Sequence, residues 1–200
     1  VAAVLHLDID HLSTYTLTVD AETVLSREDI PVTPAPDEDV QPDRYEALAA
    51  AASGKGFERY ELAYHASPGH ACRYNLSTWA HGEYLGFGLG AHDHRRGTRS
   101  RNHRRLDRYL ESVAAGVRPR LGSERLSPAE QERDRLMLGF RLAAGTPVTG
   151  TARRFLSSPE GRRLIDIGVL TVEGDRALVT DPLLADAVAR EALSVSGSDC

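Results

Sequence analysis

Two stretches of this 200-residue chain hold residues whose types and spacing fit chemistry. The first contains alternating glycines, Gly86, Gly88 and Gly90. Because these residues lack a Cβ, their backbone can closely approach another backbone or a flat ligand. A strand bend or helix–strand packing accounts for the same glycines equally well, so both interpretations stay open. The run does not match the dinucleotide-binding fingerprint, whose spacing and strand–helix context differ.

The second stretch is the basic segment 92–105, which is rich in Arg and His. A solvated loop is the favoured interpretation. Two alternatives stay open, because Arg side chains match the carboxylates of a porphyrin and also the phosphates of a nucleic acid. His92 and His94 form a His-x-His pair that fits metal ligation, but no Cys or third ligand follows at the spacing of a zinc site.

The composition is that of an ordinary globular protein, with 41% hydrophobic and 26% charged residues. The net charge of −5 gives no general reason to expect nucleic-acid or membrane binding. Two cysteines, Cys72 and Cys200, favour a reducing compartment, here the cytoplasm, over a disulfide scaffold. The first residues contain neither a basic leader nor a long apolar run, so we expect no signal peptide and no membrane span. The chain reads as part of a longer protein.

Hydrophobic patterning predicts an α/β arrangement in the first part of the chain. Residues 11–19 and 57–65 alternate in the manner of strands, and the Ala-rich residues 43–53 between them are typical of a helix that Gly54 terminates. A strand, a helix and a strand in this order predict a parallel sheet or barrel. Residues 66–103 show little periodicity, which is typical of a functional segment.

Helices are predicted to dominate the rest of the chain. Apolar residues at helical spacing predict a helix over 106–113 that ends at Gly116, and Ser127 with Glu130 forms a capping box. Further elements are predicted as helices over 127–144, 158–168 and 181–193 and a hairpin of 169–172 with 177–179. This pattern favours a winged-helix-like module. A boundary near 117–127 divides the chain into predicted domains 1–116 and 117–200.

Four segments together resemble a known family. Residues 60–79 read YELAYHASPGHACRYNLSTW and residues 84–92 read YLGFGLGAH. They resemble the YEISNYARPGHxxRHNxxYW and YLGLGxGAH motifs of radical S-adenosylmethionine heme chaperones and oxygen-independent coproporphyrinogen III oxidase-like proteins. Residues 11–19 and 130–145 resemble two further motifs of that family, in the same order. The resemblance spans nearly the whole chain and concerns only the C-terminal part of the family.

The resemblance implies a fold and a set of cofactors. The implied fold is α/β, with the last strands of a partial (β/α) radical S-adenosylmethionine barrel followed by an α-helical, winged-helix-like C-terminal domain. The family uses S-adenosylmethionine, a [4Fe–4S] cluster held by a CxxxCxxC motif, and heme. Such a cluster needs three thiolates, whereas Cys72 stands alone in the relevant region and Cys200 lies in the tail. We therefore expect this chain to hold no cluster and to be inactive as an enzyme by itself.

The resemblance also implies a heme site. The family's His-Asn-x-x-Tyr-Trp motif reads Tyr74-Asn75-Leu76-Ser77-Thr78-Trp79 here, so Tyr74 replaces the His and Thr78 replaces the Tyr. Tyrosinate can ligate heme iron, and Trp79 can stack on a porphyrin face. We expect Tyr74, Asn75 and Trp79 to lie near heme. Neighbouring imidazoles offer substitute ligands: His65, His70 and His81.

The resulting hypothesis is a fragment of a heme chaperone-like protein that holds heme or porphyrin and passes it to apo-heme proteins. The expected partner is the missing N-terminal half of the barrel. We expect the edge of the S-adenosylmethionine site to be formed by Gly86, Gly88, Gly90 and His92. The alternative is a winged-helix protein that binds nucleic acid through Arg95–Arg105. We disfavour nucleic acid because the last predicted helix carries one Arg, Arg190, beside acidic residues.

Overall fold

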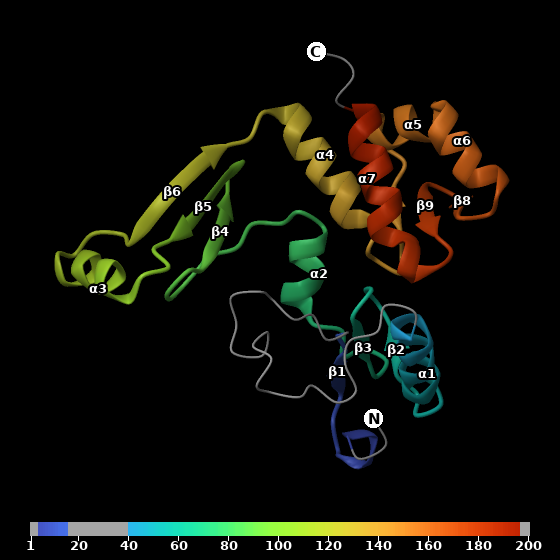
Figure 1. The fold of residues 1–200 in the computed structure, drawn as a ribbon, viewed down its shortest axis with the longest axis horizontal. Coiled ribbons are helices and arrows are strands. Elements are labelled where there is room, and N and C mark those ends of the chain that lie inside the picture. Colours follow the sequence, from blue (N-terminus) through green and yellow to red (C-terminus); the bar gives the residue numbers. More distant parts are fainter. Residues whose placement is uncertain (1–3, 16–39, 197–200) are drawn as a thin grey trace. The chain divides into compact units, whose positions relative to one another are not determined.

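A computed structural model describes residues 4–15 and 40–196, which fall into two compact units, Val1–Cys72 and Arg73–Cys200 (Figure 1). The division into domains 1–116 and 117–200 concerns the family's domains and stays a prediction. The residues expected to separate those domains, 117–127, contain a strand that is paired within the second unit.

The first unit combines a small sheet with one long helix. It contains η1 (Val4–His6), β1 (His11–Ser13), α1 (Gln41–Ser53), β2 (Glu58–Arg59) and β3 (Tyr64–Ala66). The strand order is β1-β3-β2, and β3 pairs antiparallel with both neighbours. The predicted helix is confirmed, and the predicted strand at 11–19 is confirmed over 11–13, while its residues 16–19 lie outside the described residues.

The predicted single strand over 57–65 and its parallel pairing are wrong. The segment folds back on itself as β2 and β3, because the buried carboxylate of Glu61 accepts a hydrogen bond from the Ala63 amide at 2.7 Å and stabilises a turn. The strands β1 and β2 run in the same direction, but β3 lies between them and separates them.

The second unit begins with a helix and a three-stranded sheet. Its elements are α2 (Arg73–Trp79), β4 (His92–Arg95), β5 (Thr98–Asn102), α3 (Leu106–Ala114) and β6 (Arg120–Arg125), and the antiparallel sheet has the order β4-β5-β6. The basic run is therefore a hairpin, which corrects the expected solvated loop. Arg96 and Gly97 form its two-residue turn with φ of 49° and 69°, the conformation that matches the twist of a hairpin.

The capping box of the next helix, α4 (Pro128–Gly139), is confirmed, since the Ser127 hydroxyl accepts from the Glu130 amide and the Glu130 carboxylate accepts from the Ser127 amide. The helix ends at Gly139 and does not continue to Gly145 as predicted. Beyond Phe140 the backbone hydrogen bonds join residues three apart, as in a tighter 3₁₀ turn, and the Arg141 amide donates to the Leu138 carbonyl at 3.1 Å.

The remaining elements enclose the core of the second unit. They are β7 (Thr146–Pro147), α5 (Gly150–Ser157), α6 (Pro159–Asp166), β8 (Leu170–Glu173), β9 (Arg176–Val179), η3 (Pro182–Leu184) and α7 (Ala185–Ser196). The predicted hairpin is confirmed as β8 and β9, and β7 adds a third strand on the free side of β9. Phe140 and Phe155 meet edge to face at the centre of the core, with ring centroids 5.9 Å apart.

No helix within residues 4–15 and 40–196 is long and apolar enough to cross a membrane.

Candidate functional site

Helix α2 places the residues of the predicted heme motif on one short element of the second unit. Tyr74 is 59% exposed, and its ring lies edge to face against Tyr84, with centroids 6.2 Å apart. The Thr78 hydroxyl, which stands where the family has a Tyr, donates to the Tyr74 carbonyl at 3.0 Å. Asn75 is half-buried. The exposed Tyr74 can therefore meet a ligand, whereas Thr78 completes the helix.

Trp79 at the end of α2 is half-buried and already has an aromatic-face partner. The guanidinium of Arg141 lies 4.6 Å from its ring centroid and is held by Asp186 at 2.6 Å. A porphyrin that stacked on this side of Trp79 would have to displace Arg141.

The alternating glycines have different structural reasons. A Cβ at Gly86 would collide with the carbonyl oxygen of His92, so this glycine permits a close backbone approach within the unit. Gly88 and Gly90 have φ of 97° and 67°, a region that side chains other than glycine rarely adopt. The Asn102 amide donates to the Gly88 carbonyl at 2.9 Å and holds the segment against β5. A structural role thus accounts for Gly86, and a cofactor role for Gly88 and Gly90 stays a prediction.

The side chains between these glycines point outward. Phe87 is 84% exposed, and Leu85 and Leu89 are each 48% exposed. Tyr84, which contacts Tyr74, precedes them directly in the chain. The motif of α2 and the glycine-rich segment are therefore joined through one tyrosine pair. His92 follows on β4, is exposed, and pairs with Arg101 of β5.

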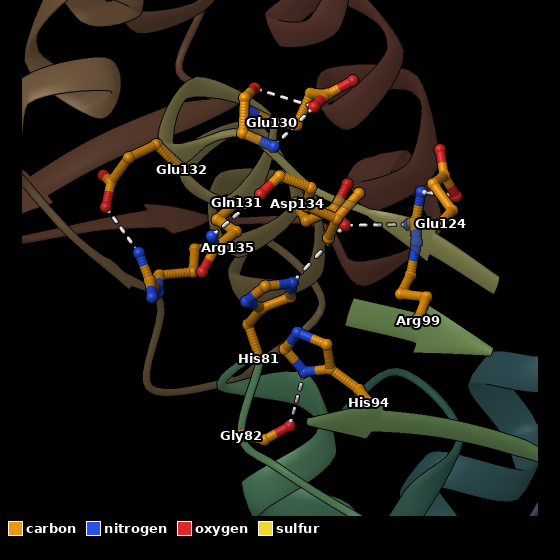
Figure 2. Close-up of polar contacts among 12 residues, drawn as sticks. His81, Gly82, His94, Arg99, Glu124, Glu130, Gln131, Glu132, Asp134 and Arg135 are labelled. Carbon is orange, nitrogen blue, oxygen red and sulfur yellow. Dashed lines mark hydrogen bonds and ion pairs between the residues drawn. The ribbon is translucent and has the colours of Figure 1, made fainter. Parts of the chain in front are cut away.

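A second group of polar residues was not predicted as a cluster. The buried rings of His81 and His94 lie 4.3 Å apart, and the His81 Nε2 atom lies 3.4 Å from Asp134 Oδ2 (Figure 2). Asp134 also pairs with Arg99 at 2.9 Å, and the His94 Nδ1 atom hydrogen-bonds to the Gly82 carbonyl at 3.0 Å. This His81 cluster connects the end of α2 with β4, β5 and α4.

The surroundings of His81 favour the neutral form of its ring. Burial is the main cause that holds the pKa of His81 below its usual value, followed by the neighbouring His94, while Asp134 acts in the opposite direction. Within the part of the chain that the structure describes, no group of three His, Cys, Asp or Glu residues is arranged to hold a metal ion. The cluster is therefore a junction between elements, and the His-x-His spacing on β4 gives no metal site among these residues.

The substitute heme ligands are unevenly accessible. The side chain of His81 is 5% exposed, and His65 of the first unit is 2% exposed, with a pKa lowered by burial and then by Arg59 and His11. His70, also in the first unit, is exposed and lies 3.4 Å from Asp10. Among these imidazoles, only His70 can meet an external ligand without a rearrangement.

The thiols do not fit an iron–sulfur cluster. The whole sequence contains two cysteines, one fewer than the three thiolates of a radical S-adenosylmethionine cluster, and Cys200 lies outside the described residues. Cys72 is a half-buried free thiol.

Comparison with solved structures defines the class of fold. The chain is similar over its whole length to half of a chain described as coproporphyrinogen III oxidase (HemN) from Escherichia coli, a radical SAM enzyme, with a TM-score of 0.72 and 13% sequence identity. The described fold is therefore similar to that of half of this enzyme.

Sequence relatives define the family. The chain is 35% identical over 198 residues to heme chaperone HemW of Mycobacterium tuberculosis and 28% identical over 161 residues to heme chaperone HemW of Bacillus subtilis. These matches cover 96% and 78% of this chain but 50% and 42% of the relatives, so the chain spans about half the length of the proteins it matches. No family model matches. The chain belongs to the HemW-type radical SAM family and corresponds to its C-terminal part, which confirms the resemblance seen in the motifs.

Proposed function

We propose that this chain is the heme-handling part of a heme chaperone-like radical SAM protein. It binds heme or a porphyrin on the surface formed by α2 and the glycine-rich segment, and a longer protein or complex passes the heme to apo-heme proteins in the cytoplasm. The radical chemistry of the family belongs to the cluster-bearing half of such proteins, since this chain has too few thiolates for the cluster.

The contact between Tyr74 and Tyr84 is the observation that carries this proposal. It joins the exposed phenol of α2 to the segment that carries the exposed Leu85, Phe87 and Leu89, so that an oxygen ligand and apolar side chains belong to neighbouring parts of one unit. A porphyrin needs both an axial ligand for its iron and an apolar surface for its ring. In this proposal Tyr74 ligates the iron, Asn75 lies near the bound heme, and Trp79 anchors the end of α2 through its contact with Arg141.

The same proposal assigns the neighbouring residues. Gly88, Gly90 and His92 border the S-adenosylmethionine site when the cluster-bearing half is present, with the glycine backbone lying close to that cofactor. We further propose that residues 117–200 correspond to the wing-like helical domain of the family, a proposal that the shared core of α4, α5, α6 and α7 with the β8–β9 hairpin supports. A nucleic-acid function is disfavoured because Arg99 and Arg105 of the basic run are already paired with carboxylates.

Titration with hemin tests the proposal. We expect a saturable Soret band with one hemin per chain, and Tyr74→Phe should weaken binding at least tenfold and remove the spectral signature of ferric tyrosinate. Tyr109→Phe is the matched control, since Tyr109 lies on α3 of the same unit. Absence of a saturable Soret band, or equal spectra for Tyr74→Phe and the unaltered chain, would overturn the proposal.

A further inference from the structure

A pocket of about 370 Å³ lies within the second unit, and its lining includes Trp79 but not Tyr74. Elements far apart in the sequence supply its walls, which consist of Trp79, Ala80, Glu132, Arg135, Leu136, Gly139, Leu142, Gly145, Thr146, Pro147, Thr149, Ala152 and Arg176. The volume lies within the range of pockets that hold small organic molecules, which begins at about 300 Å³.

The pocket is largely apolar and carries a positive charge. The indole of Trp79 and the side chains of Leu136 and Leu142 give it an apolar surface. The lining contains two guanidinium groups, those of Arg135 and Arg176, and one carboxylate, that of Glu132, which leaves a net charge of about +1. A ligand that matches these walls has an apolar body and one negative charge.

Several contacts hold the walls in place before any ligand binds. Arg141 fixes one side of Trp79, and Arg176 donates to the carbonyls of Ala144 and Gly145, the latter at 2.5 Å. The Arg135 Nη1 atom lies 2.6 Å from Glu132, and Arg135 remains about half exposed. Its Nη2 atom has no hydrogen-bond partner among the described residues, so it can donate to an anion. A preformed site of this kind loses little free energy to ordering when a ligand binds.

We propose that this pocket binds a small organic anion, an aromatic or branched apolar molecule that carries a single carboxylate or sulfonate. The apolar body lies against Trp79, Leu136 and Leu142, and the anionic group accepts hydrogen bonds from Arg135 and Arg176. The site shares Trp79 with the expected heme motif, whereas the groups that bind the anion, Arg135 and Arg176, lie outside α2 and the glycine-rich segment.

Fluorescence of the unaltered 200-residue chain tests this proposal, because Trp79 is the single Trp of the sequence and lines the pocket. The probes are 8-anilinonaphthalene-1-sulfonate and its neutral analogue N-phenyl-1-naphthylamine. We expect saturable binding of one sulfonate probe per chain, with energy transfer from Trp79. Arg135→Gln should weaken the sulfonate about tenfold, the change expected on loss of a charge-assisted hydrogen bond, and the neutral probe less than twofold.

Two further variants make the result decisive. Arg108→Gln is the matched control, because Arg108 forms the same exposed i,i+3 pair with Glu111 on α3, and it should bind the sulfonate as the unaltered chain does. Ala80→Phe, at an exposed position in the pocket lining, should block both probes without changing the melting temperature. Non-saturable binding, equal effects of Arg135→Gln and Arg108→Gln, unimpaired binding by Ala80→Phe, or displacement of the sulfonate by one equivalent of hemin would each overturn the proposal.

Discussion

Acidification should destabilise the second compact unit through His81. Burial beside His94 lowers the pKa of His81 in the folded chain, whereas the unfolded chain has the ordinary value of about 6.5. The unfolded state therefore binds the proton more tightly. The stabilisation that depends on a neutral His81 is complete above about pH 6.5 and is lost as the pH falls toward the lowered pKa of the folded state.

The size of the effect follows from the number of protons taken up. One proton bound on unfolding reduces the free energy of unfolding by at most about 1.4 kcal/mol for each pH unit. The slope that His81 contributes is therefore about half of this limit at pH 6.5, and it increases toward the limit as the pH falls further, until the folded state also takes up the proton. His81→Asn removes the contribution, and Asn is a suitable replacement because it tolerates the φ of 60° found at this position.

The assay is urea unfolding followed by the fluorescence of Trp79 from pH 7.5 to pH 5. The slope of stability against pH should be smaller for His81→Asn than for the unaltered chain. Asp134→Asn should have the opposite effect, since Asp134 raises the pKa of His81 and its neutralisation makes the buried imidazolium less favourable still. Equal slopes for the unaltered chain and His81→Asn would refute the assignment of this titration to His81.

Gly86→Ala should destabilise the second unit by about 1–3 kcal/mol in urea, because its methyl group would collide with the His92 carbonyl, whereas Gly122→Ala has open space and should change stability by less than about 0.5 kcal/mol. Comparable losses in the two variants would contradict this reason. Ser127→Ala should cost about 1 kcal/mol through loss of the helix cap, as judged by thermal unfolding, and an unchanged midpoint would count against it. Phe87→Ser should leave stability within about 0.5 kcal/mol but reduce light scattering at high concentration, since the side chain is 84% exposed. Unchanged scattering would contradict the expectation that Phe87 promotes self-association of the chain.

Local signals predicted the start or the end of several helices, whereas α2 and α5 were not predicted and α4 ends earlier than expected. The capping box at Ser127 and the glycine after α1 act within one turn of the chain, so their residue types were sufficient. The stripe on α3 predicted the helix but not its environment. Leu106 and Leu110 are 59% and 53% exposed, and periodicity alone does not reveal whether a partner covers an apolar face.

Long-range contacts determine two features that the sequence did not predict, the split strand over residues 57–65 and the His81 cluster. Alternation over residues 57–65 fits one strand or two, and only the turn that buries Glu61 decides between them. The His81 cluster joins residues that are 13 and 53 positions apart in the chain, a spacing that no motif encodes. Its one local signal was a glycine directly after His81, which marks a sharp turn at the end of α2.

The glycine-rich segment distinguishes two kinds of constraint that chemical synthesis can separate. At Gly88 and Gly90 the constraint is the sign of φ, and a D-alanine residue prefers this positive region for the same reason that an L residue avoids it. At Gly86 the constraint is the space occupied by the carbonyl of His92, which an L side chain cannot share. D-alanine at Gly88 and Gly90 would thus preorganise these two positions by restricting the unfolded chain. The family's glycines need not be regarded as one motif with one purpose.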